Sequence, residues 1–91
     1  MKIVIVGDGK VGFTLAQQLT KEGHDIVVLD SNKNVLQESL VPLDVMVVHG
    51  NGASLKVQKE AGVESCDLVI SATSADEINL LCCIIARKLG H

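Results

Sequence analysis

Aromatic residues are almost absent from this sequence: its 91 residues include one phenylalanine, Phe13, and no tryptophan or tyrosine. Proteins that hold single-stranded nucleic acid stack bases on aromatic rings and neutralise phosphates with basic side chains. The formal net charge here is −3, so both features are missing. Nucleic acid is therefore not expected as a partner.

Long hydrophobic runs are missing as well, although 47% of the residues are hydrophobic and the mean hydropathy is +0.36. No stretch approaches the about 18 residues that a membrane-spanning helix needs. The first residues carry no cleavable apolar signal, so we expect a cytoplasmic protein whose excess apolar surface is covered by a partner. Cys66, Cys82 and Cys83 lack the C-x-x-C spacing of zinc or redox sites and are expected as small core residues.

Four short apolar runs are present instead, and each is continuous rather than alternating with polar residues. They cover residues 3–6, 26–29, 45–48 and 68–70. Continuous runs are typical of parallel strands that helices cover on both faces, and each intervening segment has room for one helix and two loops. The sequence predicts an α/β fold: a Rossmann-like, doubly wound parallel sheet with strand order 3-2-1-4. We expect residues 1–91 to form a single nucleotide-binding domain that stops before strands 5 and 6.

Four helices are expected between and after these runs. They cover residues 10–22, residues from 31 or 32 to before Pro42, residues 54–61 with Ser54 as the cap, and residues 75–89. Gly23 and Gly62 are typical of left-handed helix stops, and Ser74 with Glu77 is typical of a capping box. The last helix is apolar over seven consecutive residues, 80–86. We therefore expect it to be covered on both sides.

A glycine-rich turn follows the first apolar run directly: Gly7-Asp8-Gly9-Lys10-Val11-Gly12. A G-x-G-x-x-G segment between a strand and a helix, with an acid ending the next strand, is the dinucleotide-binding fingerprint. The first glycine permits a tight turn, the second lets the backbone approach a pyrophosphate, and the third lets the helix pack on the strand. The first N–H groups of the helix then point at the phosphates, and Lys10 can add a positive charge. Asp8 would repel the phosphates and is expected to point to solvent.

Asp30 ends the second apolar run, where its carboxylate can accept hydrogen bonds from ribose hydroxyls and would repel a 2′-phosphate. This favours NAD or an adenine nucleotide over NADP; a simple helix cap is the alternative. Asn51, Thr73 and Ser74 follow the third and fourth runs, close to the point where the strand order reverses. They can bond a nucleotide or serve as turn and cap residues, and the sequence leaves both roles open. His49 is expected to be structural.

With these residues in view, the chain resembles the N-terminal nucleotide-binding domain of Trk-type potassium uptake regulators, in the RCK/KTN family. The segments that carry the resemblance are spread over essentially the whole chain: 1–12, 15–16, 23–25, 29–30, 50–54, 60–63, 72–77 and 79–80. It implies a non-enzymatic cytoplasmic protein at the inner face of the membrane that binds NAD(H), or ATP or ADP. Such a domain gates a membrane potassium transporter or channel through ligand-dependent assembly.

The resemblance also implies which residues contact the ligand and which helix mediates assembly. The ligand positions are Gly7, Asp8, Gly9, Lys10, Val11, Gly12, Asp30, Asn51, Thr73 and Ser74. The helix at 75–89 would form the homodimer from which a ring is built.

An NAD-dependent oxidoreductase fragment is the competing interpretation. Without tyrosine, the Tyr-x-x-x-Lys relay of short-chain reductases is absent, and no Cys/His or Ser/His/Asp arrangement near the switch point offers acid–base chemistry. Catalysis would then need a second domain. A third interpretation is an assembly module whose site is empty.

Overall fold

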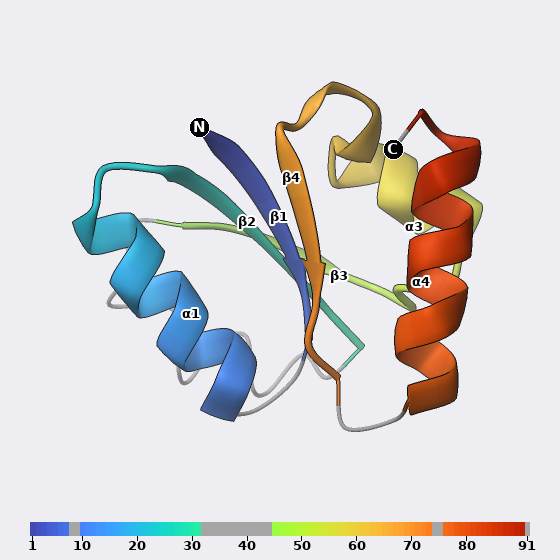
Figure 1. Ribbon diagram of the computed structural model, residues 1–91, viewed down its shortest axis with the longest axis horizontal. Helices are drawn as coiled ribbons and strands as arrows, with labels where there is room; N and C mark the ends of the chain where they lie inside the picture. Colours follow the sequence, from blue (N-terminus) through green and yellow to red (C-terminus); the bar gives the residue numbers. More distant parts are fainter. Residues whose placement is uncertain (8–9, 32–44, 74–75, 91) are drawn as a thin grey trace.

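The computed structural model describes residues 1–7, 10–31, 45–73 and 76–90, with the backbone alone for residues 10, 11 and 76–78. Four parallel strands form one sheet: β1 (Lys2–Val6), β2 (Asp25–Asp30), β3 (Met46–His49) and β4 (Leu68–Ser71). Their order is β3-β2-β1-β4, as the sequence predicted. Helix α1 (Lys10–Lys21) covers one face, and α3 (Leu55–Glu60) and α4 (Asp76–Lys88) cover the other (Figure 1).

The two central strands are hydrophobic along their whole length because both of their faces are covered. Alternate side chains of β1 and β2 enter two separate clusters. Ile3, Ile5, Ile26 and Val28 pack with Ala16 of α1. On the other face, the cluster consists of Val4, Val6, Val27, Leu29, Ala61, Val63, Cys66, Cys82 and Ala86. The predicted double-sided core is therefore confirmed.

The helix ends follow the local signals in the sequence. Gly23 adopts a left-handed conformation with φ of 87° just after α1. The hydroxyl of Ser54 accepts a hydrogen bond from the Val57 N–H at 3.4 Å and caps α3. Gly62, with φ of 84°, separates α3 from a 3₁₀ turn at Val63–Ser65. The helix expected between residue 31 and Pro42, and the capping box of Ser74 and Glu77, lie outside the described residues.

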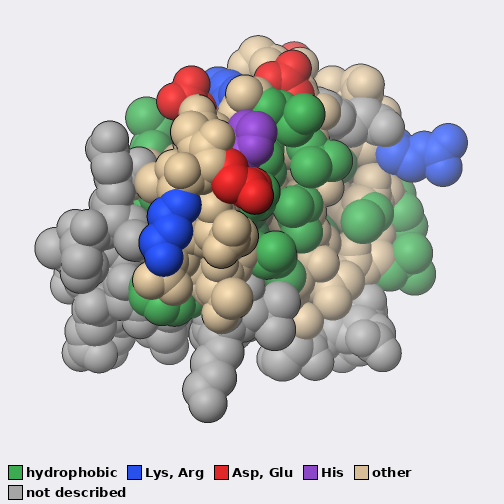
Figure 2. Space-filling view, turned by 60° about the vertical axis from the view of Figure 1, so that its left-hand side comes forward, with side chains coloured by type: hydrophobic (Ala, Val, Ile, Leu, Met, Phe, Trp, Pro, Cys, Tyr) green, Lys and Arg blue, Asp and Glu red, His purple; other side chains and the backbone are tan. Residues whose placement is uncertain are grey.

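Helix α4 is buried on one side only. Cys82 and Ala86 face the core, with 0% and 3% of their surface exposed, whereas Leu80, Leu81 and Ile84 are 63%, 45% and 52% exposed. The described residues thus cover one of the two sides that were expected to be covered. Hydrophobic side chains also form a band on the face that Figure 2 shows.

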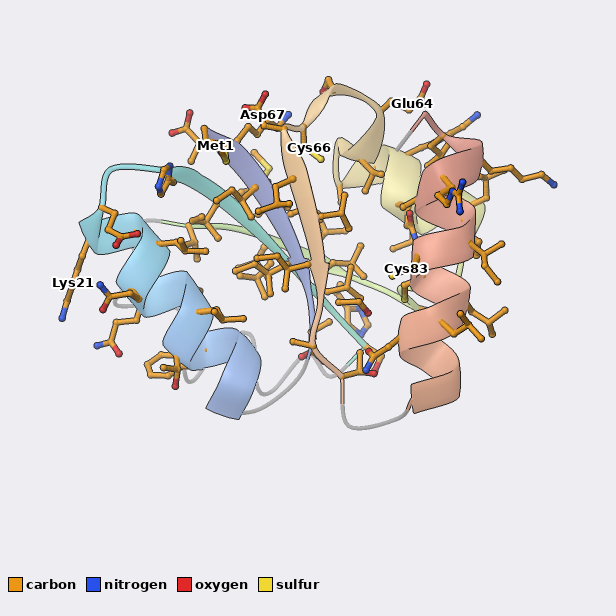
Figure 3. All side chains as sticks on the ribbon, viewed as in Figure 1. Met1, Lys21, Glu64, Cys66, Asp67 and Cys83 are labelled. Atoms are coloured by element: carbon orange, nitrogen blue, oxygen red, sulfur yellow. The ribbon has the colours of Figure 1, made fainter. Side chains whose placement is uncertain are left out.

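Two of the three cysteines are core residues, as expected, and the third is not. Cys66 and Cys82 are buried, whereas Cys83 is exposed. Successive residues of an α-helix point about 100° apart, so Cys82 and Cys83 cannot both face the core. Cys83 instead lines a groove of about 250 Å³ beside Leu68 and Arg87. Cys66 and Asp67 lie near Met1, at the amino end of the sheet (Figure 3).

Candidate functional site

The carboxyl ends of the strands meet at one edge of the sheet. The Gly7 N–H donates to the Leu29 carbonyl at 3.0 Å, and the Ala72 N–H donates to the Val6 carbonyl at 2.6 Å. The ends of β2, β1 and β4 are therefore tied together in that order. In open α/β sheets, ligands bind outside this edge where the strand order reverses, which here is between β1 and β4.

Gly7 sits where the chain has no room for a side chain. A Cβ at this position would lie 2.8 Å from the Ala72 carbonyl oxygen, which belongs to the backbone and cannot swing away. Gly12 is the point where α1 approaches the turn, since its Cβ would lie 3.4 Å from the Gly7 oxygen. Gly12 thus lies at a close approach of the helix, as the sequence predicted, whereas Gly7, which was predicted to permit a tight turn, is required by lack of space beside Ala72.

The middle of the glycine-rich turn is only partly visible. Asp8 and Gly9 lie outside the described residues, and so do the side chains of Lys10 and Val11. The backbone of Lys10 opens α1, so this helix begins at the edge where β1 ends. A helix N-terminus presents N–H groups that lack intrahelical partners, together with the positive end of the helix dipole. The phosphate roles of these residues stay predictions.

Asp30 lies at the expected edge, in register with His49 of β3. Its side chain is buried, with 3% of the residue exposed, and its carbonyl accepts the Gly50 N–H at 2.9 Å. The His49 Nε2 lies 3.0 Å from the Ser31 carbonyl, an oxygen that only accepts, so Nε2 carries the proton. His49 therefore ties the ends of β2 and β3 together, which agrees with its expected structural role.

Asn51 stands at the turn between β3 and α3. Its side chain is exposed, and Oδ1 accepts the Ala53 N–H at 2.9 Å, which makes an Asx turn. The Asn51 carbonyl also accepts the Ser54 N–H at 3.0 Å. The turn role that the sequence allowed is thus present, and the ligand role stays a prediction.

Thr73 follows β4 and is held by Asn79, a residue of the first turns of α4 that was not among the predicted site residues. Asn79 Oδ1 accepts the Thr73 N–H and the Thr73 hydroxyl, and Nδ2 donates to the Thr73 carbonyl. The Ser71 hydroxyl also donates to Asn79 Oδ1, at 2.9 Å. Asn79 therefore shapes the loop beside the switch point. Ser74 lies outside the described residues.

Gln58 is a second residue that the sequence did not single out. It belongs to α3 and is completely buried. Its Nε2 donates to the Gly52 carbonyl at 2.8 Å and to the Cys82 carbonyl at 3.0 Å. The signal that could have identified Gln58 is a polar residue next to Val57 and three positions before Ala61, on the buried side of a short helix.

The comparisons with known proteins place this arrangement in a family. The model of the TrkA-N domain matches residues 3–91. The chain belongs to the TrkA-N domain family. The Trk system potassium uptake protein TrkA homolog of Methanothermobacter thermautotrophicus is 40% identical to this TrkA-N domain over 88 residues. The Trk system potassium uptake protein TrkA of Halomonas elongata is 42% identical over 89 residues.

The TrkA-N domain spans only part of these relatives. The alignments cover 97% and 98% of this chain, but 41% of the Methanothermobacter protein and 20% of the Halomonas protein. Among solved structures, the Kef CTD of Shewanella denitrificans in its AMP-bound form superposes with a TM-score of 0.82 at 23% identity. That superposition covers 97% of this chain and 52% of the Kef chain, and it supports the fold.

Within residues 1–7, 10–31, 45–73 and 76–90, no group of three or more His, Cys, Asp or Glu residues could hold a metal ion. None of the helices in these ranges combines the length and the apolar character that crossing a bilayer requires.

Proposed function

We propose that this TrkA-N domain is a non-enzymatic, nucleotide-binding regulatory unit of a potassium uptake system. In this proposal, residues 1–91 act as one cytoplasmic nucleotide-binding domain that works at the inner face of the membrane. The observation that carries the proposal is the switch point, where the Gly7 turn packs on Ala72 and α1 begins at the same edge.

The nucleotide would lie across this edge. Its phosphates would sit at the start of α1, against the backbone of residues 7–12, where N–H groups and the helix dipole favour an anion. Asp30 would accept hydrogen bonds from the ribose. Asn51, Thr73 and Ser74 would line the remaining rim, with the Thr73 loop already shaped by Asn79.

NAD(H) is the proposed ligand, with ATP or ADP as the second choice. A carboxylate at the end of β2 is compatible with a free 2′-hydroxyl and repels a 2′-phosphate, so NADP(H) should bind more weakly. The AMP held by the related Kef fold is an adenine nucleotide, which agrees with this ligand class.

A regulatory role is favoured over an oxidoreductase fragment. The His49 ring, at this edge, is engaged through Nε2 with the Ser31 carbonyl. A reductase would need a positioned proton donor near the substrate. The two curated relatives are named for potassium uptake, which makes a membrane potassium transporter or channel the proposed partner.

Assembly is proposed to use the exposed side of α4. Leu80, Leu81 and Ile84 offer apolar surface that a second copy can bury, giving a homodimer from which a ring is built. Nucleotide regulates assembly only if it binds the assembled and free states with different affinities.

The experiment is calorimetric titration of the purified chain with NADH, NAD, NADPH, ATP, ADP and AMP. We expect NADH to bind more tightly than NADPH. Asp30→Asn should lower the affinity for NADH by about tenfold, equivalent to about 1.4 kcal/mol of binding free energy. Asp25→Asn is the matched control, because Asp25 is exposed at the opposite end of the same strand. Unchanged affinity in Asp30→Asn would contradict the ribose assignment.

Binding of none of the six nucleotides would overturn the nucleotide proposal. The assembly part is tested separately by sedimentation velocity with and without the bound nucleotide. An identical distribution of oligomers in both conditions would contradict ligand-dependent assembly.

A further inference from the structure

Gln58 joins two parts of the molecule that are far apart in the sequence. Its Nε2 donates to the Gly52 carbonyl in the loop after β3 and to the Cys82 carbonyl in α4. The Gln58 side chain is completely buried, so both bonds are shielded from water. One amide group therefore bridges the loop that carries Asn51 and the helix whose outer side is exposed.

The loop and α4 also touch directly beneath this bridge. A Cβ at Gly52 would lie 3.2 Å from the Cys82 Sγ and 3.2 Å from Leu29 Cδ2, so the Gly52 backbone rests on α4 and β2. Cys82 has no exposed surface. Interiors packed this closely transmit small shifts, because neither partner can move without displacing the other.

The bridge is not needed to complete α4. Cys82 lies in the middle of this helix, where its carbonyl faces the N–H of Ala86 in the regular α-helical pattern. Gln58 therefore adds a second donor to that oxygen. Gln58 Oε1 has no hydrogen-bond partner among the described residues, and burying such an oxygen is unfavourable. The position is thus occupied by a glutamine whose Nε2 bonds two separate elements although its Oε1 is left unsatisfied, which favours a positioning role.

We propose that Gln58 is a positioning residue that couples nucleotide occupancy at the loop after β3 to the placement of α4. The inference rests on the proposed nucleotide site, since Asn51 belongs to the rim of that site. A nucleotide that fixes the loop fixes Gly52, and Gln58 passes the constraint to Cys82. Because the exposed side of α4 carries Leu80, Leu81 and Ile84, nucleotide and assembly then influence each other reciprocally.

Cys82 itself reports the contact, because its thiol is fully buried against the Gly52 loop and becomes accessible when α4 moves off that loop. The chain carrying Cys83→Ser is treated with N-ethylmaleimide in the absence and in the presence of nucleotide. The nucleotide is NADH or ATP, whichever of the two binds. Tandem mass spectrometry then identifies which cysteine is modified. Cys66 is the internal reference, because it is buried at the opposite edge of the sheet. Ligand at about a hundred times its Kd should slow Cys82 modification by at least about tenfold and change Cys66 less than about twofold.

Three variants distinguish the loss of the Gln58 hydrogen bonds from a general loss of stability. Gln58→Met keeps the length of the side chain and removes the Nε2 donor. We expect its affinity for the nucleotide to stay within about threefold of that of the parent chain. The nucleotide should slow the modification of Cys82 in this variant by less than about twofold. Gln58→Leu is a second variant without the donor. Lys56→Met, at an exposed position of α3, should keep the full slowing.

The outcomes distinguish this inference from the function on which it rests. Nucleotide binding without slowing of Cys82 in the parent chain overturns the coupling and leaves the nucleotide site in place. Equal slowing in Gln58→Met overturns the role of Gln58. Absence of nucleotide binding in the parent chain overturns the proposed function, and the coupling with it.

Discussion

The side-chain amide of Asn79 pairs with both main-chain groups of Thr73. Nδ2 donates to the Thr73 carbonyl at 3.1 Å, and Oδ1 accepts the Thr73 N–H at 2.9 Å. A main-chain N–H only donates and a carbonyl only accepts, so these two bonds fix the orientation of the amide. The start of α4 therefore holds the loop that follows β4, at the edge of the sheet where the candidate site lies.

Truncation of Asn79 should loosen this loop. Asn79→Ala removes the oxygen that accepts hydrogen bonds from the Ser71 hydroxyl and from the N–H and hydroxyl of Thr73, and we expect the free energy of unfolding to fall by about 1–3 kcal/mol. Asn79→Asp keeps an oxygen for these donors, and the positive end of the α4 dipole offsets the repulsion between its second carboxylate oxygen and the Thr73 carbonyl, so its loss of stability should be smaller than that of Asn79→Ala. Urea denaturation measures the free energy of unfolding of both variants. Equal decreases in the two would show that the acceptor oxygen of Asn79 does not stabilise the loop.

Substitution of Gly7 should destabilise the domain even without ligand. Gly7 does not adopt a left-handed conformation, so its requirement is space next to the Ala72 carbonyl. Overpacking against backbone in Gly7→Ala should lower the free energy of unfolding by about 1–3 kcal/mol. Gly23→Ala is the contrasting variant: nothing lies within 4 Å of its Cβ, and its φ of +87° makes the backbone conformation the source of the loss. Unchanged stability in Gly7→Ala would contradict the packing role.

The buried thiols should make stability fall at alkaline pH. Burial raises the pKa of the Cys66 and Cys82 thiols, because a thiolate is poorly solvated in the core. In the unfolded chain, a cysteine thiol has a pKa of about 8.5. Above that pH the unfolded chain loses protons that the native chain keeps, so the free energy of unfolding decreases until the folded pKa is reached.

Urea midpoints measured between about pH 8 and about pH 10 should therefore fall, and the decrease should be shallower in Cys82→Ala. Cys83→Ala is the control, because Cys83 is exposed. The same slope in both variants would mean that the buried thiol does not contribute.

Charges on the exposed side of α4 should prevent self-association without unfolding the chain. Leu80 and Ile84 lie four residues apart on one side of the helix. Leu80→Asp or Ile84→Asp should weaken self-association by at least about tenfold while changing the free energy of unfolding by no more than about 0.5 kcal/mol. Gln18→Asp adds the same charge at an exposed position of α1 and should have no effect on sedimentation. Retained association in both α4 variants would exclude this face as the interface.

The strands could be predicted from the sequence where helices cover both faces of the sheet. β1 and β2 are covered on both faces, so hydrophobicity alone marks their position. β3 was expected at 45–48 and is found at Met46–His49, because an edge strand with mostly exposed residues has no hydrophobic boundary. The ends of α1 and α3 were predictable because Gly23 and Gly62 adopt left-handed conformations there.

The candidate site could be predicted only in part. The glycine motif is local, and so is the contact of Gly12 with Gly7, whereas the contact of Gly7 with Ala72 depends on the pairing of β1 with β4. The roles of Gln58 and Asn79 depend on partners in other elements, 24 residues away for the Gln58 bond to Cys82. Hydrogen bonds of this kind follow from tertiary packing, and no periodicity in the sequence marks them.

The pairing of β1 with β4 also determines at which stage of folding the candidate nucleotide site can form. The Lys2 N–H bonds the Asp67 carboxylate at 2.8 Å across 65 residues of sequence, and Ser71 is the partner of Val6. Contacts between such distant segments form late, because loop closure must precede them. During synthesis, the glycine turn and Asp30 leave the ribosome long before β4. We therefore expect a nascent chain to acquire affinity for its ligand only after β4 has joined the sheet.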